Sequence, residues 1–206
     1  MLASPRSYEE IVEQYRVEHR GRAVDERRYF KRHKSLTQAI RNAALALGPE
    51  GRRYSHQWLV PQRALEAAAI ALLGVQEQVA SAPTFSELFR VVERTIAPIH
   101  GIGPLAVYDT ALRIGAFRQL EPDCVYLHAG VLEGAKALGR HERQTLQMSD
   151  LPKAFHKLRP SEVEDVLCIF RAAIRAINSG KPGTTADNCG PRVSRARHKG
   201  FRANRC

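Results

Sequence analysis

The sequence predicts an all-α protein: a single compact helical domain, with a tight helical hairpin at its centre and a disordered basic tail at its C-terminal end. Apolar residues recur at spacings of three and four along most of the first 177 residues, and the strict alternation typical of strands is absent. A chain of 206 residues, 44% of them hydrophobic, is long enough to bury a core. We therefore expect one folded domain over residues 1–177.

Three capping-box patterns predict where helices begin. In this pattern a Ser or Thr side chain caps the helix, and a Glu three residues later bonds back to the capping residue. The pairs are Ser7 with Glu10, Thr84 with Glu87, and Ser161 with Glu164, the last opening a helix that should run to Ile177.

Apolar spacing predicts further helices between these starts, most of them ending at a glycine. One long helix is expected over residues 25–48, and another over about 58–74 with Pro61 in its first turn. The later ones are expected at 104–115, at about 122–138, and just after Asp150.

Residues 178–206 differ from the rest of the chain in composition. They lack apolar periodicity and are rich in Gly, Ser, Asn and Arg, which is typical of disorder. They carry seven Lys and Arg residues against Asp187 alone, more than half of the chain's net charge of +11. Such a surplus favours polyanions, either nucleic acid or an acidic membrane surface. The tail is either an extension without function or an arm that binds nucleic acid.

Membrane and metal functions are disfavoured by the composition. No apolar run approaches the roughly 20 residues needed to cross a bilayer, and residues 1–5 do not begin a signal peptide, so we expect a cytoplasmic protein with no membrane partner. Cys124 and His128 stand four apart and could supply two metal ligands, but a structural zinc site needs four. We expect no metal and no cofactor. The other cysteines, which form no CxxC pair, are Cys168, Cys189 and Cys206.

A connection of only a few residues, 98–103, separates the two central helices and predicts the tight hairpin. Gly101 and Gly103 permit backbone angles closed to other residues, and Ile102 can fill the space between the helices. The N–H groups at the start of the second helix then point outward, where hydrogen bonds and the helix dipole both favour a phosphate.

These features favour a helix-hairpin-helix phosphate clamp on duplex DNA. Such a clamp contacts the sugar-phosphate backbone and therefore gives affinity without sequence information. A plain packing corner is the alternative for the turn, and the run 27–34 is either a second DNA-contacting face or a solvated helix face. The residues expected to contact DNA are His100, Gly101, Ile102, Gly103, Leu105 and Arg113.

The run of residues 101–113, GIGPLAVYDTALR, resembles the hairpin of the base-excision DNA glycosylase superfamily, and the resemblance extends over about residues 84–138. In that family the hairpin holds the DNA backbone beside the lesion, and a carboxylate near the start of the next helix assists cleavage of the glycosidic bond. The resemblance implies Asp123 as the catalytic residue, with Tyr126 at that place in an alternative alignment. Asp123 is otherwise an ordinary first-turn acid stabilised by the helix dipole.

The resemblance also implies which accessory activities are missing. Family members that cut the DNA strand carry a lysine shortly after the second hairpin glycine, where this chain has Pro104, Leu105 and Ala106. A lyase activity through a Schiff base is therefore not expected. Cysteines for an iron–sulfur cluster are absent near the end of the domain as well.

Three functions remain open from the sequence. The principal one is a DNA-binding protein that grips duplex phosphates largely independently of sequence. The second is a DNA repair enzyme, a monofunctional glycosylase that removes a damaged or modified base with the help of Asp123. The third is a helical module whose basic surface binds an acidic protein. The substrate base, the protein partners and the oligomeric state are not determined by the sequence.

Overall fold

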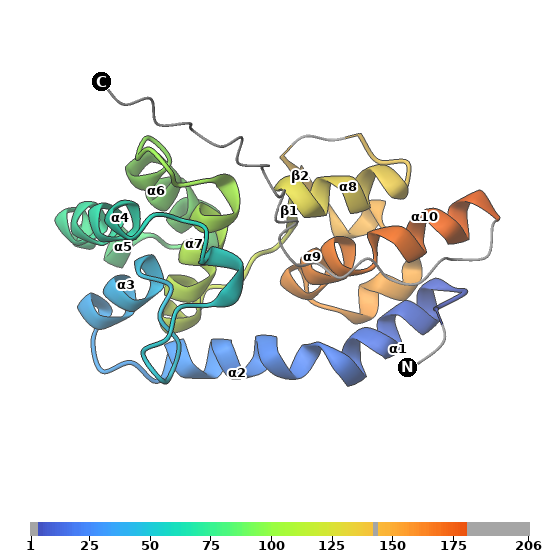
Figure 1. Cartoon of the computed structure of the whole chain (residues 1–206), viewed down its shortest axis with the longest axis horizontal. Coiled ribbons are helices and arrows are strands. Elements are labelled where there is room, and N and C mark those ends of the chain that lie inside the picture. Colours follow the sequence, from blue (N-terminus) through green and yellow to red (C-terminus); the bar gives the residue numbers. More distant parts are fainter. Residues whose placement is uncertain (1–3, 142–143, 181–206) are drawn as a thin grey trace, which may run out of the picture.

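The computed structural model describes residues 4–141 and 144–180, and in this part of the chain it is an all-α fold, as predicted (Figure 1). Three short 3₁₀-helices and a two-stranded sheet accompany ten α-helices. The elements are α1 (Tyr8–Glu18), α2 (Arg20–Lys31), α3 (Leu36–Ala44), η1 (Ser55–Gln57), α4 (Gln62–Gly74), α5 (Gln76–Ser81), α6 (Phe85–Ile96), α7 (Pro104–Arg118), β1 (Val125–Tyr126), α8 (Ala129–Ala137), β2 (Thr145–Leu146), η2 (Met148–Asp150), η3 (Lys153–Lys157), α9 (Pro160–Ile169) and α10 (Arg171–Ser179).

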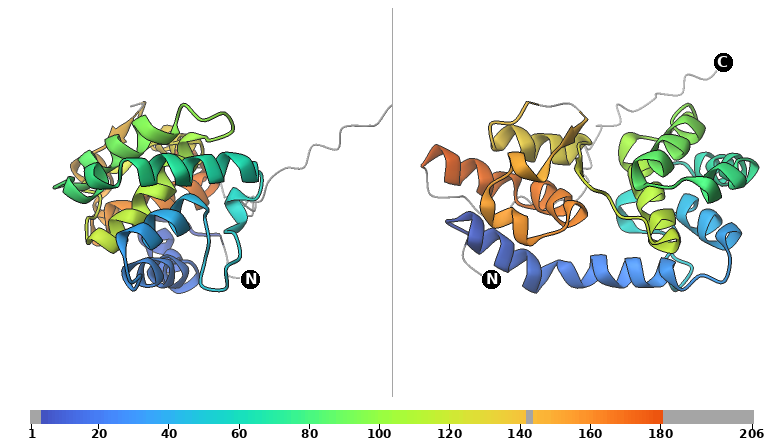
Figure 2. Two further views of the ribbon diagram at one scale, coloured as in Figure 1. Left: turned by 90° about the vertical axis from the view of Figure 1, so that its left-hand side faces the viewer. Right: turned by 180° about the vertical axis from the view of Figure 1, so that it is seen from behind.

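The hydrophobic core of this compact domain is divided between two halves, which α2 joins along the base of the molecule (Figures 1 and 2). One core lies among α2 to α7 and includes Phe30, Leu88 and Ile114, all fully buried. The other lies among α1, β1 and α8 to α10 and includes Phe155 and Leu167. The first helix therefore completes the half that the last helices build, so both ends of the described part of the chain, residues 4 and 180, belong to the same half.

The prediction of a single helix over residues 25–48 is wrong, because the structure has two helices there, α2 and α3. The Ser35 hydroxyl accepts a hydrogen bond from the N–H of Gln38 at 3.2 Å and so starts a new helix. Phe30 and Ile40, on either side of the break, are buried in the same core. The apolar spacing therefore continues across a change of helix direction that the spacing itself cannot reveal.

The region predicted as one helix over 122–138 is also different in the structure. Gln119 adopts a left-handed conformation with φ of 59° and ends α7, and α8 begins only at Ala129. Between them β1 pairs antiparallel with β2, with Val125 opposite Leu146. The expected absence of strands is wrong to this extent, since strands of two residues are too short to show alternation.

Other expected starts and ends are partly confirmed. Ser7 caps α1 and Thr84 caps α6 as predicted. The last predicted helix begins instead after Arg159, whose N–H donates to Glu162 at 2.9 Å, and it is interrupted at Phe170. The helix expected at about 58 begins at Gln62, which leaves Trp58 exposed before it.

The tail boundary predicted at residue 178 is too early, because α10 continues to Ser179. The Asn178 side chain also accepts a hydrogen bond from the Tyr8 hydroxyl at 2.5 Å and donates one to the Ala137 carbonyl at 2.5 Å. These contacts tie the end of α10 to the first helix and to α8. The rest of the predicted tail, residues 181–206, lies outside the described residues.

The second half depends on a close crossing of α8 and α9 at Gly134. A Cβ atom at this position would overlap the backbone carbonyl group of Leu167, whereas a Cβ at Gly21 in α2 would meet nothing within 4 Å. Gly134 thus allows the two helix backbones to approach, and the only relief for a larger residue is to separate the helices.

We predict that Gly134→Ala lowers the free energy of unfolding by at least about 2 kcal/mol, because the added methyl group overpacks a backbone contact. Gly21→Ala is the matched control and should raise it by about 0.5 kcal/mol through helix propensity alone. Urea denaturation of both variants measures the difference. Equal stabilities of the two variants would show that the helices do not approach as closely as the structure indicates.

Candidate functional site

The predicted hairpin is present between α6 and α7. Gly101 has φ of 95°, a left-handed value that favours glycine, and a Cβ atom there would lie only 3.2 Å from Cδ of Pro61. Gly103, in contrast, has φ of −98° and ψ of 169°, and a Cβ atom there would meet nothing within 4 Å. Only Gly101 therefore needs to be glycine, which corrects the expectation that both glycines are required.

The N-terminus of α7 has no capping side chain. Gly103 is the N-cap and has no side chain to bond the first N–H groups, and Pro104 occupies the first helical position. In residues 4–141 and 144–180, the N–H groups of Leu105 and Ala106 have no hydrogen-bond acceptor. The structure thus places uncapped donors beside His100 and Gly101, which are both exposed.

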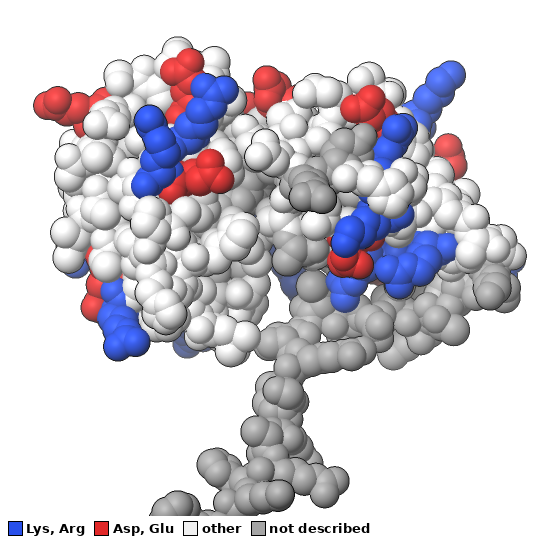
Figure 3. All heavy atoms as spheres, turned by 90° about the horizontal axis from the view of Figure 1, so that it is seen from above, with Lys and Arg blue, Asp and Glu red and all other residues white. Residues whose placement is uncertain are grey.

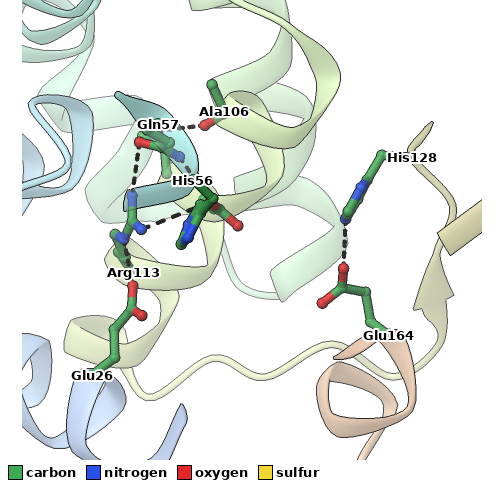
Figure 4. Close-up of polar contacts among 9 residues, drawn as sticks. Glu26, His56, Gln57, Ala106, Arg113, His128 and Glu164 are labelled. Atoms are coloured by element: carbon green, nitrogen blue, oxygen red, sulfur yellow. Dashed lines mark hydrogen bonds and ion pairs between the residues drawn. The ribbon is translucent and has the colours of Figure 1, made fainter. Parts of the chain in front are cut away.

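Arg113 lies away from this end of the hairpin and in the core. Its side chain is 2% exposed, its Nε donates to Glu26 at 2.6 Å, and its Nη1 donates to Gln57 at 3.3 Å (Figure 4). Its guanidinium also lies 4.5 Å from the ring centroid of Tyr54. The expectation that Arg113 contacts DNA is therefore corrected: its charge is already used inside the protein.

The sequence predicted Asp123 at the start of a helix, and this prediction is wrong. Asp123 is exposed in the connection between α7 and β1, where its carboxylate bonds to the thiol of Cys124. Burial raises the pKa of that thiol to about 11. Tyr126, the alternative at this place, is buried against the rings of Phe85 and Phe89.

A second group of polar side chains surrounds Asp109 on α7. Its Oδ2 accepts hydrogen bonds from His56 Nε2 and from Gln57 Nε2, both at 2.8 Å. Burial raises the pKa of Asp109, but the bond from His56 and the charge of Arg113 outweigh it and hold the pKa below its usual range. The same bond raises the pKa of His56.

Further ionisable side chains lie on the opposite side of the junction between the two halves (Figure 4). His128, the N-cap of α8, lies 2.7 Å from the carboxylate of Glu164 on α9, and both side chains are buried. Asp165 accepts a hydrogen bond from Tyr15 at 2.8 Å. Burial raises the pKa of Glu164, and burial together with the charge of Glu164 raises the pKa of Asp165 to about 8.

The two sides of the junction affect each other electrostatically. The negative charge of Asp109 raises the pKa values of Glu164 and Asp165, although these residues belong to the other half. The hydroxyl of Tyr108 is buried nearby on α7 and has no hydrogen-bond partner among the described residues. The sequence offered little indication of this cluster of ionisable residues, because they lie far apart along the chain and share no motif.

Comparisons with known proteins leave the site to be judged by its geometry. No protein-family model matches the chain, and neither a curated protein nor a solved structure does. Within the described residues, no helix has the length and apolar character needed to cross a membrane. In the same part of the chain, no three metal-ligating side chains come together, and Cys124 and His128 both precede α8 instead of sharing a helix.

We predict that Asp165→Asn makes stability less dependent on pH. Asp165 has a higher pKa in the folded protein than its ordinary 3.8, so the folded state binds the proton more tightly than the unfolded state between about pH 4 and 8. The contribution of Asp165 to the free energy of unfolding of the wild type is present at low pH and is lost as the pH rises through 8. From pH 5 through pH 7 to pH 9, the urea concentration at the unfolding midpoint should fall more steeply for the wild type than for the variant. Parallel curves would argue against the raised pKa.

Proposed function

We propose that this protein binds duplex DNA through its helix-hairpin-helix, by contacting backbone phosphates with little dependence on sequence. The observation that carries the proposal is the uncapped N-terminus of α7 at a tight turn. The N–H groups of Leu105 and Ala106 have no acceptor in the described part of the chain, and the positive end of the helix dipole lies at the same point. A phosphate oxygen supplies the missing acceptor.

Arginines around the hairpin support this proposal. Arg90 and Arg94 are exposed along α6, the helix that leads into the turn, and Arg63 is exposed at the start of α4. Pro61 and Ala64 of that segment lie next to Gly101, which brings Arg63 close to the turn. None of the three arginines forms an ion pair with another described residue, so their charges are available to phosphates.

The face of the molecule seen from above does not offer a broad basic patch (Figure 3). On the face seen from above, Lys and Arg side chains alternate with Asp and Glu (Figure 3). On this face, affinity for DNA would come from the geometry of the hairpin and the few arginines near it. The charged residues of the predicted tail, which add to any attraction for polyanions, lie outside the described residues.

We predict that Gly103→Asp abolishes DNA binding without destabilising the fold. Asp is a favourable N-cap, and its carboxylate would take the same N–H groups that a phosphate needs. Gly103→Ala is the matched control, because its backbone angles and the free space around it allow a methyl group while the donors stay open. Fluorescence anisotropy with a labelled duplex measures the affinity of both variants, and thermal denaturation checks the fold.

Salt dependence provides a second test of the same proposal. Release of counterions from two or more contacted phosphates should weaken wild-type binding by about tenfold between 50 and 200 mM salt. Binding that is insensitive to salt, or that Gly103→Asp leaves unchanged, would contradict the proposal. Absence of DNA binding together with a stable acidic protein partner in a pull-down would favour the helical interaction module instead.

A second candidate function is removal of a damaged or modified base by a glycosylase without lyase activity. The specific observation in its favour is the gathering of Asp109, Glu164 and Asp165 at the junction between the halves, close to the hairpin helix. Of these acids only Asp109 has a lowered pKa, so its carboxylate is the one that would stabilise the positive charge that develops on the sugar as the base leaves. This candidate has two possible sources of the carboxylate, Asp123 and the junction acids.

We predict that Asp123→Asn keeps full activity if the junction acids supply the carboxylate and loses it if Asp123 does. Duplexes carrying uracil, hypoxanthine, 8-oxoguanine or alkylated purines are incubated with the protein and then treated with alkali, which breaks the strand at each abasic site. Asp109→Asn is the companion variant. Absence of strand breaks with wild-type protein on every duplex would remove this candidate and leave the binding proposal standing.

A further inference from the structure

The loop of residues 54–61 is fixed to the hairpin at two points. In its middle, Gln57 is 1% exposed and bonds to both Asp109 and Arg113 of α7. At its end, Pro61 packs against the position of Gly101 in the turn. These two contacts hold the loop against the hairpin between the middle of α7 and the turn, and His56 directly precedes the first of them.

His56 is exposed on this loop in a defined orientation. Its side chain is 45% exposed, its Nε2 bonds to Asp109 at 2.8 Å, and its ring lies against that of Tyr54 at 6.2 Å between centroids. The other ring nitrogen, Nδ1, has no partner among the described residues. Because Asp109 is an acceptor, Nε2 must carry a hydrogen, and this fixes the role of Nδ1.

Protonation of His56 would change Nδ1 from an acceptor to a donor. In the neutral ring with hydrogen on Nε2, Nδ1 presents a lone pair, which repels a phosphate oxygen. In the imidazolium form, Nδ1 carries a hydrogen and can donate a charge-assisted bond to that oxygen. Asp109 holds Nε2 in both forms, so the ring need not turn.

The distance along α7 suits a second contact to the same DNA strand. Asp109 follows Pro104 by five residues, which corresponds to about 7.5 Å along the helix axis. Successive phosphates of one strand advance by about 3.4 Å along the duplex axis. A strand that is held at the N-terminus of α7 and runs alongside this helix would therefore bring a phosphate near the level of His56 within about two nucleotides.

We propose that protonated His56 is a second phosphate contact, so that binding of duplex DNA takes up a proton and weakens as the pH rises. This inference rests on the proposed DNA-binding function and adds a residue and a pH dependence to it. The ligand group is a phosphodiester of the DNA backbone.

Charged groups from three helices surround His56. Asp109 and Arg113 lie on α7, Glu26 lies on α2, and Glu164 lies on α9. The hydrogen bond to Asp109 is the largest influence and raises the pKa of His56, Glu26 acts in the same direction, and burial and Arg113 oppose them. His56 is thus held in its protonated form to a higher pH than an isolated histidine, and a bound phosphate would extend that range.

The test compares duplex affinity at pH 6.0 and pH 8.5 for the wild type and for His56→Gln, by fluorescence anisotropy at constant ionic strength. At pH 6.0 the variant should bind about fivefold more weakly than the wild type, with a salt slope smaller by about one. At pH 8.5 the two proteins should bind equally. His156→Gln, which changes an exposed histidine in the other half, should behave as the wild type does. His100→Gln should retain the part of the pH dependence that His56 supplies.

A positioning role for Asp109 gives a second readout. Asp109→Asn should move the midpoint of the pH dependence to lower pH without abolishing it, because the amide still accepts from Nε2 but no longer favours the charged ring. Side-chain NMR should show that the pKa of His56 rises when duplex is added. The inference is overturned if His56→Gln keeps the wild-type pH profile, or if duplex leaves the pKa of His56 unchanged.

The two proposals fail in different ways. If Gly103→Asp abolishes binding and His56→Gln changes nothing at either pH, only the His56 contact is refuted. If the wild type binds no duplex at pH 6.0 or at pH 8.5, both are refuted.

Discussion

The buried guanidinium of Arg113 is the interaction on which the arrangement of the hairpin depends. Burying a cation is unfavourable unless its charge and its donors are matched, and here Glu26 supplies the charge while Gln57 accepts a bond. These partners lie on α2 and on the loop before α4. One side chain therefore joins the helix that connects the halves, the loop beside the turn, and the second hairpin helix. Loss of Glu26 would leave Asp109, 3.7 Å from the guanidinium, as the remaining carboxylate, and loss of Gln57 would remove one hydrogen-bond acceptor from it.

The same network explains why ionisable groups gather where they do. Gln57 uses one end of its amide for Arg113 and the other for Asp109, so the loop cannot move without breaking both bonds. Asp109 in turn fixes His56. On the other side of the junction, Glu164 and Asp165 stay near this carboxylate although it makes their ionisation harder. Acids that raise each other's pKa are unfavourable for stability, which is a common feature of functional sites.

Part of the candidate site could be predicted from the sequence, because that part is local. The turn of residues 98–103, with Gly101 in a left-handed conformation, follows from two adjacent helix patterns and a glycine between them. The role of Arg113 could not be predicted, because a charged residue on a helix looks solvent-facing until its partners are known. Glu26 and Gln57 precede it by 87 and 56 residues. No spacing rule relates positions so far apart.

The sequence by itself determined the helical class, the capped starts of α1 and α6, and the hairpin, since each arises from interactions within a few residues. The tertiary structure decided where helices break, as at Ser35 and Phe170, because the segments on both sides of each break pack into the same core and must change direction to reach it. It also decided that the core has two parts and that His56 meets Asp109. These outcomes require segments distant in sequence to be packed together, and only the folded chain specifies that packing.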